Sequence, residues 1–259
     1  MRPLFLRYDQ EGFWRNYWQS FSVDPERFEN LEMYPIGPTL SIVRRGHKIL
    51  EAGCGAGRIL RHLTAEGFDV EGIEFDSGIV AALAKADPTL RVTRGDVRAL
   101  DFPDATFDVV LCFGAIGVLE NDIDQGLSEL RRVLRRGGTL VCSVMLENVA
   151  RQAQRFVSGM MNRRLPLSFY AWMDTERGWC RFFRSRGLEV TRAEPVVLRY
   201  NLHHWLPILR KGPVDLRRTR IDDESYQFNA LGNAAWFLHK RWFRRSLAAG
   251  STFFLRAGE

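Results

Sequence analysis

The chain has 259 residues, and 46% of them are hydrophobic, which is enough to bury one full core. The longest apolar run, residues 109–119, is shorter than the ~20 residues needed to cross a bilayer, and the first residues lack the pattern of an export signal, so a cytoplasmic protein is expected. Residues 1–150 hold 17 Lys and Arg against 22 Asp and Glu, whereas residues 151–259 hold 20 against 9, a net charge of +11. The basic second half favours an anionic partner: a phosphorylated or carboxylated small molecule, a membrane surface or nucleic acid.

A helix with an aromatic face is predicted near the N-terminus. Its aromatic residues are Phe13, Trp14, Tyr17, Trp18 and Phe21. They recur at helical spacing, which indicates that they share one side of the helix. That side either packs on the edge of a sheet or places a ring such as Trp14 or Tyr17 over a cationic ligand, a contact worth about 0.5 to 2 kcal/mol.

A glycine-rich loop follows a short apolar strand at residues 47–57, which read H-K-I-L-E-A-G-C-G-A-G. Ile49 and Leu50 are typical of a buried strand end, and the three alternate glycines indicate a tight turn into a helix over residues 58–65. Glycine suits such a turn because it adopts positive φ and lets the backbone approach a ligand closely. The loop therefore predicts a nucleotide-type cofactor site at a helix N-terminus. A dinucleotide fingerprint, G-x-G-x-x-G, would need glycine where Arg58 stands.

A second strand is predicted over residues 68–75, and Glu74 stands near its end, 17 positions after Gly57. In a strand-helix-strand unit this spacing returns the carboxylate to the sheet edge that holds the glycine loop, where it can accept both ribose hydroxyls of a nucleoside. The alternative is an ordinary solvated acid at a strand end. A third short strand is predicted before the segment R-G-D-V, which contains Asp96.

Two further segments complete the first half. Residues 107–118 contain a long apolar run, and residues 129–140 read E-L-R-R-V-L-R-R-G-G-T-L; both resemble segments of a known enzyme family, where they form the fourth strand and a helix followed by the fifth strand. Together with the loop E-A-G-C-G-A-G and the segment G-D-V, these motifs resemble those of the class I S-adenosylmethionine (SAM) dependent methyltransferases, in the methyltransferase type 11, UbiE-like, small-molecule group. The resemblance extends to about residue 145.

This resemblance implies a doubly wound α/β fold with a seven-stranded, mostly parallel sheet in the order 3-2-1-4-5-7-6, its last strand antiparallel. It implies SAM as the cofactor and S-adenosylhomocysteine as the product, with Glu74 on the ribose, Asp96 at the adenine amino group and Cys54 packed beneath the cofactor. The residues implied to line the cofactor site are Glu51, Gly53, Cys54, Gly55, Gly57, Glu74, Phe75, Asp96, Val97 and Phe113.

We expect a single methyltransferase domain over residues 1–259. It would comprise N-terminal cap helices in residues 1–46, a SAM-binding core in residues 47–145, and the remaining sheet with a helical cap in residues 146–259. The four cysteines form no C-x-x-C pair, so they are predicted to be reduced thiols, and no metal site is expected.

The second half predicts fewer elements. Helices are expected over residues 147–161 and, with Asp174 or Thr175 as the cap, up to about residue 186. Gly187 closes the second helix and opens a strand. Residues 251–257 predict the last strand, antiparallel beside the fifth, and residues 200–250 are assigned to a helical cap over the active site.

The catalytic residue is left unassigned. Many relatives carry histidine in a G-V-x-E-H motif after the fourth strand, but this chain reads G-V-L-E-N and ends the motif at Asn121. Asparagine cannot take up a proton at neutral pH, so a general base at that position is not expected. The remaining candidates are His203 and His204 in the cap, and Tyr17, although a histidine in such a place is more often structural.

One helix in the cap is predicted to be amphipathic. Over residues 236–247, Lys240, Arg241, Arg244 and Arg245 share one side, and apolar residues mostly occupy the other. Such a helix either buries its apolar face in the cap or makes a peripheral contact with an anionic membrane. A membrane contact would suit a lipid-linked or greasy substrate.

These features predict methyl transfer from SAM to a small-molecule acceptor, hydrophobic or anionic, at N, O or C by in-line displacement. One alternative is a methyltransferase that acts on RNA or protein. The other is a regulatory protein that binds SAM without catalysis. RNA is disfavoured because no RNA-binding module is recognisable, and DNA is not expected as a partner.

Overall fold

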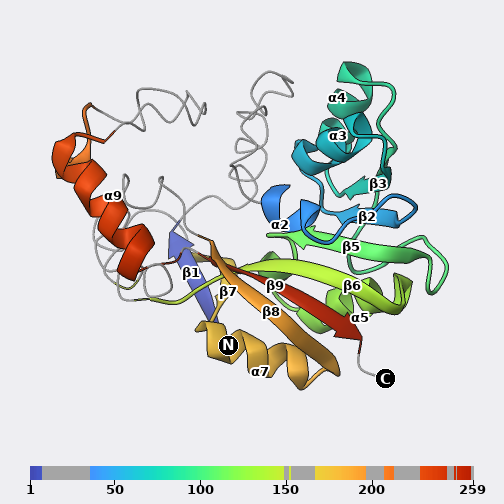
Figure 1. Ribbon diagram of the computed structural model, residues 1–259. Coiled ribbons are helices and arrows are strands. Elements are labelled where there is room, and N and C mark those ends of the chain that lie inside the picture. The colour runs from blue at the N-terminus through green and yellow to red at the C-terminus, as the bar shows by residue number, and fades with distance from the viewer. Residues whose placement is uncertain are drawn as a thin grey trace.

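Seven strands form one sheet through the centre of the protein (Figure 1). The computed structural model describes residues 1–7, 36–148, 152, 167–196, 207–212, 228–243, 248 and 250–257. The strands, in chain order, are β2 (Lys48–Ala52), β3 (Asp69–Glu74), β4 (Val92–Arg94), β5 (Phe107–Phe113), β6 (Leu134–Met145), β8 (Leu188–Val196) and β9 (Gly250–Ala257).

The order of these strands is β4-β3-β2-β5-β6-β9-β8. Neighbours from β4 to β6 pair in parallel, whereas β9 pairs antiparallel with both β6 and β8. Counted from β2, this is the predicted order 3-2-1-4-5-7-6 with an antiparallel last strand. The predicted doubly wound fold is therefore confirmed.

Helices cover both faces of the sheet. The helices of the described residues are α2 (Ile36–Leu40), α3 (Arg58–Ala65), α4 (Ser77–Ala86), α5 (Ile123–Val133), α7 (Glu176–Arg184) and α9 (Ala230–Trp242), with single 3-10 turns η2 (Ile116–Val118) and η3 (Pro207–Leu209). Of these, α9 lies away from the sheet, against η3 (Figure 1). Side chains alternate along each strand, so in β2 Ile49 belongs to the core cluster that contains residues of α3 and α4, while Leu50 belongs to the cluster that contains residues of α5 and α7. Both residues are fully buried, and the sheet thus has a core on each face.

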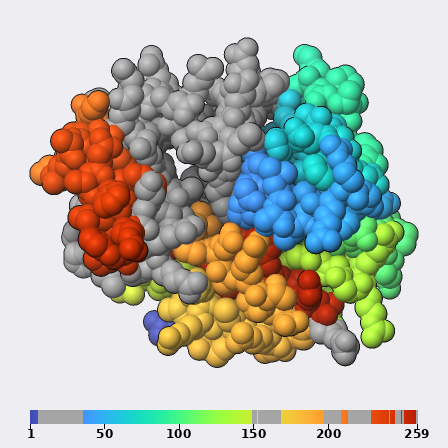
Figure 2. All heavy atoms as spheres, viewed as in Figure 1, coloured from blue at the N-terminus to red at the C-terminus, as the bar shows by residue number. Residues whose placement is uncertain are grey.

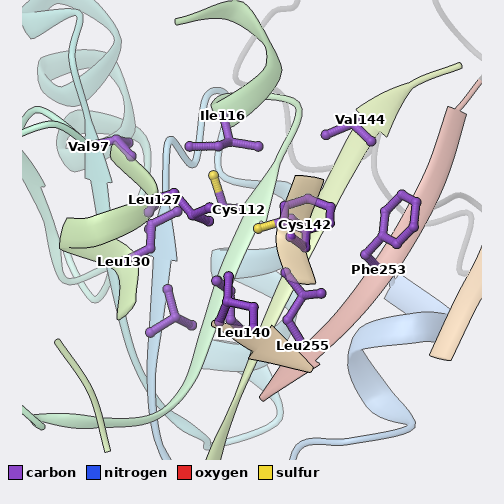
Figure 3. Packing of buried hydrophobic residues seen from close by; sticks show 14 of the residues in the cluster. Val97, Cys112, Ile116, Leu127, Leu130, Leu140, Cys142, Val144, Phe253 and Leu255 are labelled. Atoms are coloured by element: carbon purple, nitrogen blue, oxygen red, sulfur yellow. The ribbon is translucent and has the colours of Figure 1, made fainter. Parts of the chain in front are cut away.

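The larger core lies between the sheet and the pair α5 and α7. Cys112 of β5 and Cys142 of β6 are register partners, and Figure 3 places them between Leu130 of α5 and Phe253 of β9. Burial raises the pKa of the Cys142 thiol, so this group stays neutral in the apolar layer. All four cysteines of the chain are free thiols.

Helix α7 begins where the sequence predicts it. Of the two predicted caps, Thr175 is the one observed, since its Oγ1 accepts a hydrogen bond from the backbone N of Gly178 at 3.1 Å. Gly187 follows the helix with a φ of 72° and leads directly into β8. The buried ring of Trp179 joins the helix to the sheet, because its Nε1 donates to the backbone O of Met145 at 3.0 Å.

A separate two-stranded antiparallel sheet pairs β1 (Arg2–Arg7) with β7 (Leu167–Met173). This corrects the expectation that residues 1–46 form only cap helices. The strand β1 alternates, with Leu4 buried and Phe5 exposed, and the ring of Phe5 contacts the ring of Phe169 edge-on. Trp172 of β7 donates from Nε1 to the backbone O of Leu119 at 2.8 Å, which ties this small sheet to the segment after η2.

Two predicted elements end earlier than expected. The fourth strand stops at Phe113, because Gly114 adopts a φ of 83° and the chain then turns into η2. The amphipathic helix expected over residues 236–247 is α9, which ends at Trp242. The predicted helix over residues 147–161 and the N-terminal aromatic helix fall largely or wholly outside the described residues. Within the described part of the chain, no helix combines the length and hydropathy that a membrane crossing requires.

Candidate functional site

The loop after β2 turns sharply into α3 at the carboxyl ends of the parallel strands (Figure 1). Gly53 and Gly57 adopt φ values of 76° and 71°, which favour glycine. A Cβ on Gly53 would lie 2.8 Å from the Cβ of Ala115, and one on Gly57 would lie 2.9 Å from Cδ2 of Leu83. Both positions therefore need glycine for space as well as for conformation. Because Gly57 is the N-cap of α3, the first N–H groups of that helix start at this loop.

Glu74, the last residue of β3, holds this loop in place. Its Oε2 accepts a hydrogen bond from the backbone N of Gly55 at 2.9 Å, and its Oε1 accepts one from the backbone N of Asp76 at 3.1 Å. The side chain is only 8% exposed. Each carboxylate oxygen keeps a second lone pair, so the group can still accept two hydrogen bonds from neighbouring hydroxyls.

Glu51 supports the loop from below. Gly57 has no side chain with which to cap α3, and Oε2 of Glu51 accepts from the backbone N of Leu60 at 2.8 Å instead. Burial raises the pKa of Glu51 to about 8; the N–H of Leu60 and the charge of Arg58 oppose this rise, and the charge of Glu74 adds to it. Glu51 is thus a buried carboxyl whose ionisation is costly.

Cys54 fills the space between the loop and β3. Its Sγ would lie 3.2 Å from a Cβ built on Gly72, so glycine in β3 makes room for the thiol. Burial raises the pKa of the Cys54 thiol well above its usual range, and the nearby carboxylates of Glu51 and Glu74 add to this effect. The thiol is therefore neutral and acts as a small packing group, as the sequence predicts.

Asp96 lies next to Glu74 along the same edge, because the backbone N of Gly95 donates to the backbone O of Glu74 at 3.0 Å. The guanidinium of Arg98 donates two hydrogen bonds to the Asp96 carboxylate, one from Nη2 to Oδ2 at 2.7 Å and one from Nε to Oδ1 at 3.0 Å. The backbone N of Arg98 takes a further site on Oδ1 at 2.9 Å. These contacts hold the pKa of Asp96 below its usual range and occupy about three of its four acceptor sites, which leaves one for an external amino group.

Arg98 also reaches the far side of the site. Its Nη1 donates to Oδ2 of Asp122 at 2.9 Å, just before α5 begins. Asp122 therefore holds the guanidinium that orients Asp96. Sequence reasoning missed this role, although an arginine two residues after an acid in a turn is a signal that could have found it.

The remaining predicted site residues lie at the same edge in different environments. Phe75 directly follows Glu74 and is 60% exposed, Val97 is buried, and Phe113 is half-buried at the end of β5. The hydrogen bonds above connect the exits of β2, β3 and β4. The direct contacts of all these residues with a cofactor stay predictions.

The candidate catalytic residues fall outside the described part of the chain. Tyr17, His203 and His204 all belong to this group. Asn121, which replaces the histidine of relatives, is exposed before α5. Trp172 fixes the backbone just ahead of it, as described above, and no local sequence signal predicts that long-range contact.

Replacing Arg98 with glutamine is expected to reduce the preference for S-adenosylhomocysteine over S-inosylhomocysteine, in which oxygen replaces the adenine amino group. A hydrogen bond to a charged group is worth about 1.5 to 3 kcal/mol, so the wild-type protein should prefer the amino form by about tenfold or more. The variant loses the paired hydrogen bonds that orient Asp96, so it should prefer the amino form of the ligand only a few-fold. Calorimetric dissociation constants for both ligands measure the ratio, and an unchanged ratio would rule out the positioning role. Arg94→Gln, an exposed arginine at the end of β4, is the matched control.

The arrangement fits a nucleoside cofactor with a ribose and an amino-substituted base. Glu74 retains acceptor sites for two hydroxyls, and Asp96 retains one for an amino group, as counted above. Phe75, the residue after Glu74, has an exposed ring. Glycine at positions 53 and 57 allows the left-handed turn that brings the start of α3 to this edge.

Comparison with known proteins gives the class of this domain. Residues 50–142 match the methyltransferase domain family. The chain is 37% identical over 99 residues to demethylmenaquinone methyltransferase of Beutenbergia cavernae, covering 38% of this chain and 40% of that protein. It is 37% identical over 112 residues to EEF1A lysine methyltransferase 4 of Bos taurus, covering 36% and 44%. The chain spans less than half the length of these relatives.

A solved structure shows the same fold over nearly the whole chain. It is a chain of the complex between the Haloferax volcanii Trm112 methyltransferase activator and the putative methyltransferase, with a TM-score of 0.59, 17% identity, and coverage of 97% of this chain and 99% of that chain. Residues 50–142 thus match a SAM-dependent methyltransferase domain of class I, and SAM is the cofactor of this class. The predicted resemblance and cofactor are confirmed.

Proposed function

We propose that the protein transfers a methyl group from SAM to a small-molecule acceptor, hydrophobic or anionic, at N, O or C. The observation that carries the proposal is the Glu74 carboxylate, which joins the glycine loop to the start of α4 and keeps acceptor sites for a ribose. The likeness to a demethylmenaquinone methyltransferase supports a small acceptor, although a second relative is named for protein lysine. The residues of the site would be those set out above, from Glu51 to Phe113.

The proposed domain organisation is one domain, with a SAM-binding core in residues 47–145 and the remaining sheet and a helical cap in residues 146–259. Its support is the shared sheet, since β8 and β9 from the second part pair beside β6 from the first. The cap would shape the acceptor pocket.

The chemistry asks the protein mainly for positioning. Bound SAM supplies a methyl group on a sulfonium, which is a good leaving group. Glu74 and Asp96 would fix the nucleoside, and holding the acceptor in line with the methyl group can contribute about 7 to 11 kcal/mol of the barrier. A general base adds roughly 10²- to 10⁴-fold only when the acceptor must lose a proton first, so Asn121 in place of a histidine is compatible with transfer.

Methyl-labelled SAM tests this function directly. The protein is incubated with the labelled cofactor and a cell extract split into a small-molecule fraction and a macromolecular fraction. We expect label in the small-molecule fraction and formation of S-adenosylhomocysteine. Label in protein or RNA alone would instead favour the macromolecular alternative. Binding of SAM without any label transfer to either fraction would favour a regulatory protein.

A further inference from the structure

Helix α9 exposes an unusual amount of apolar surface. Six of the ten exposed large hydrophobic side chains among the described residues lie on or next to it, and they are Ile208, Leu231, Phe237, Leu238, Trp242 and Phe243. Figures 1 and 2 show α9 at the outer edge of the protein, away from the central sheet. A surface of this kind usually marks a binding site.

The exposed residues form a stripe with helical spacing. Leu231, Leu238 and Trp242 stand at i, i+7 and i+11, so they share one side of the helix. The neighbouring side packs against η3 and Phe228, where Gly232 and His239 are buried. One alternative from the sequence was that the apolar face of this helix is buried in the cap. For Leu238 and Trp242 that alternative is wrong, because both side chains are exposed.

The charged residues of α9 and of the segment that follows it up to residue 258 are all basic. Residues 225–258 contain no Asp or Glu and five Lys and Arg. Arg241 is exposed and precedes Trp242 in the helix. Aromatic rings beside arginines suit the boundary between lipid head groups and acyl chains, where the rings bury their apolar part and the arginines meet phosphate.

We propose that α9 docks the protein on an anionic lipid bilayer, with the stripe of Leu231, Leu238 and Trp242 in the acyl boundary and Arg241 among the head groups. The helix has 13 residues and can lie flat on the surface. A lipid surface fits well because the charged residues of 225–258 are all basic, and anionic lipid head groups complement them beside the apolar stripe. This docking goes beyond methyl transfer and does not depend on it.

Vesicle sedimentation tests the proposal. The full chain is mixed at low salt with phosphatidylcholine vesicles that contain phosphatidylglycerol, and separately with pure phosphatidylcholine vesicles. We expect at least tenfold stronger partitioning onto the anionic vesicles, weakened by added salt. The double variant Leu238→Asp/Trp242→Ala should lose at least tenfold of this partitioning.

A matched control is Leu40→Asp at the end of α2. Leu40 is 42% exposed and Leu238 is 41% exposed, so the two changes differ mainly in location. The control should sediment like the wild-type protein, and unchanged circular dichroism of each variant shows that it folds. Equal partitioning of the double variant and the wild type, or equal binding to neutral vesicles, would overturn the proposal. A dimer that the double variant loses would also overturn it, because the stripe would then join two copies of the chain.

Discussion

Replacing Glu74 with alanine is expected to weaken the binding of S-adenosylhomocysteine by about 100-fold or more. Two hydrogen bonds from ribose hydroxyls to a charged acceptor would be lost, each worth about 1.5 to 3 kcal/mol. In the wild type, the backbone N of Gly55 donates a hydrogen bond to the Glu74 carboxylate at 2.9 Å. The variant loses this bond, so the loop should become less well ordered. Calorimetry on the wild type and the variant measures the loss.

Two controls separate the ribose contact from a general loss of structure. Glu71→Ala changes a half-buried acid on the same strand and should leave affinity within a few-fold. The Glu74→Ala change should weaken the binding of a 2′-deoxy analogue less than it weakens the binding of the natural ligand. The reason is that the analogue already lacks one of the two hydroxyl contacts with Glu74. If Glu74→Ala bound the natural ligand as tightly as the wild type does, Glu74 would have no ribose role.

Glu51→Gln is expected to raise the stability of the protein at alkaline pH. Burial raises the pKa of Glu51 to about 8 from an ordinary value of 4.5, so the folded state holds this proton more tightly than the unfolded state does. The free energy of unfolding of the wild type should therefore fall as pH rises from about 4.5 to about 8. At roughly 1.4 kcal/mol for each unit of pKa shift, the total loss is on the order of 3 to 5 kcal/mol.

Glutamine keeps the acceptor for the backbone N of Leu60 but cannot ionise, so this variant should lose that part of the pH dependence. Urea unfolding of the wild type and Glu51→Gln at pH values near 5 and 8.5 measures the difference, and Glu71→Gln on β3 is the control. A wild-type pH dependence that survives in Glu51→Gln would show that other groups cause it.

The sheet order was predictable because the motifs of the first half resemble those of the class I methyltransferases, and that resemblance implies this order. The spacing between Gly57 and Glu74 placed the acid at the correct edge, since a strand-helix-strand unit returns the chain to that side. The start of α7 was predictable to within one residue, with Asp174 or Thr175 as its cap, because the capping signal is local; the structure shows Thr175.

Features that depend on long-range contacts could not be predicted. The pairing of β1 with β7 joins residues that are far apart in the sequence, so no local pattern could show that these two segments pair, although β7 itself is almost entirely apolar. The exposure of Leu238 and Trp242 depends on which side of α9 meets Phe228 and η3, and helical spacing alone does not decide that. The contact of Arg98 with Asp122, which lies 24 positions away, likewise has no local signal, in contrast to its contact with Asp96.

Titration of the wild-type protein with S-adenosylhomocysteine and with NAD tests most directly whether the glycine loop at Gly53–Gly57 is a SAM site. We predict binding of S-adenosylhomocysteine at micromolar or tighter affinity and no detectable binding of NAD, because Arg58 stands where a dinucleotide loop needs glycine. Binding of NAD without binding of S-adenosylhomocysteine would contradict this account.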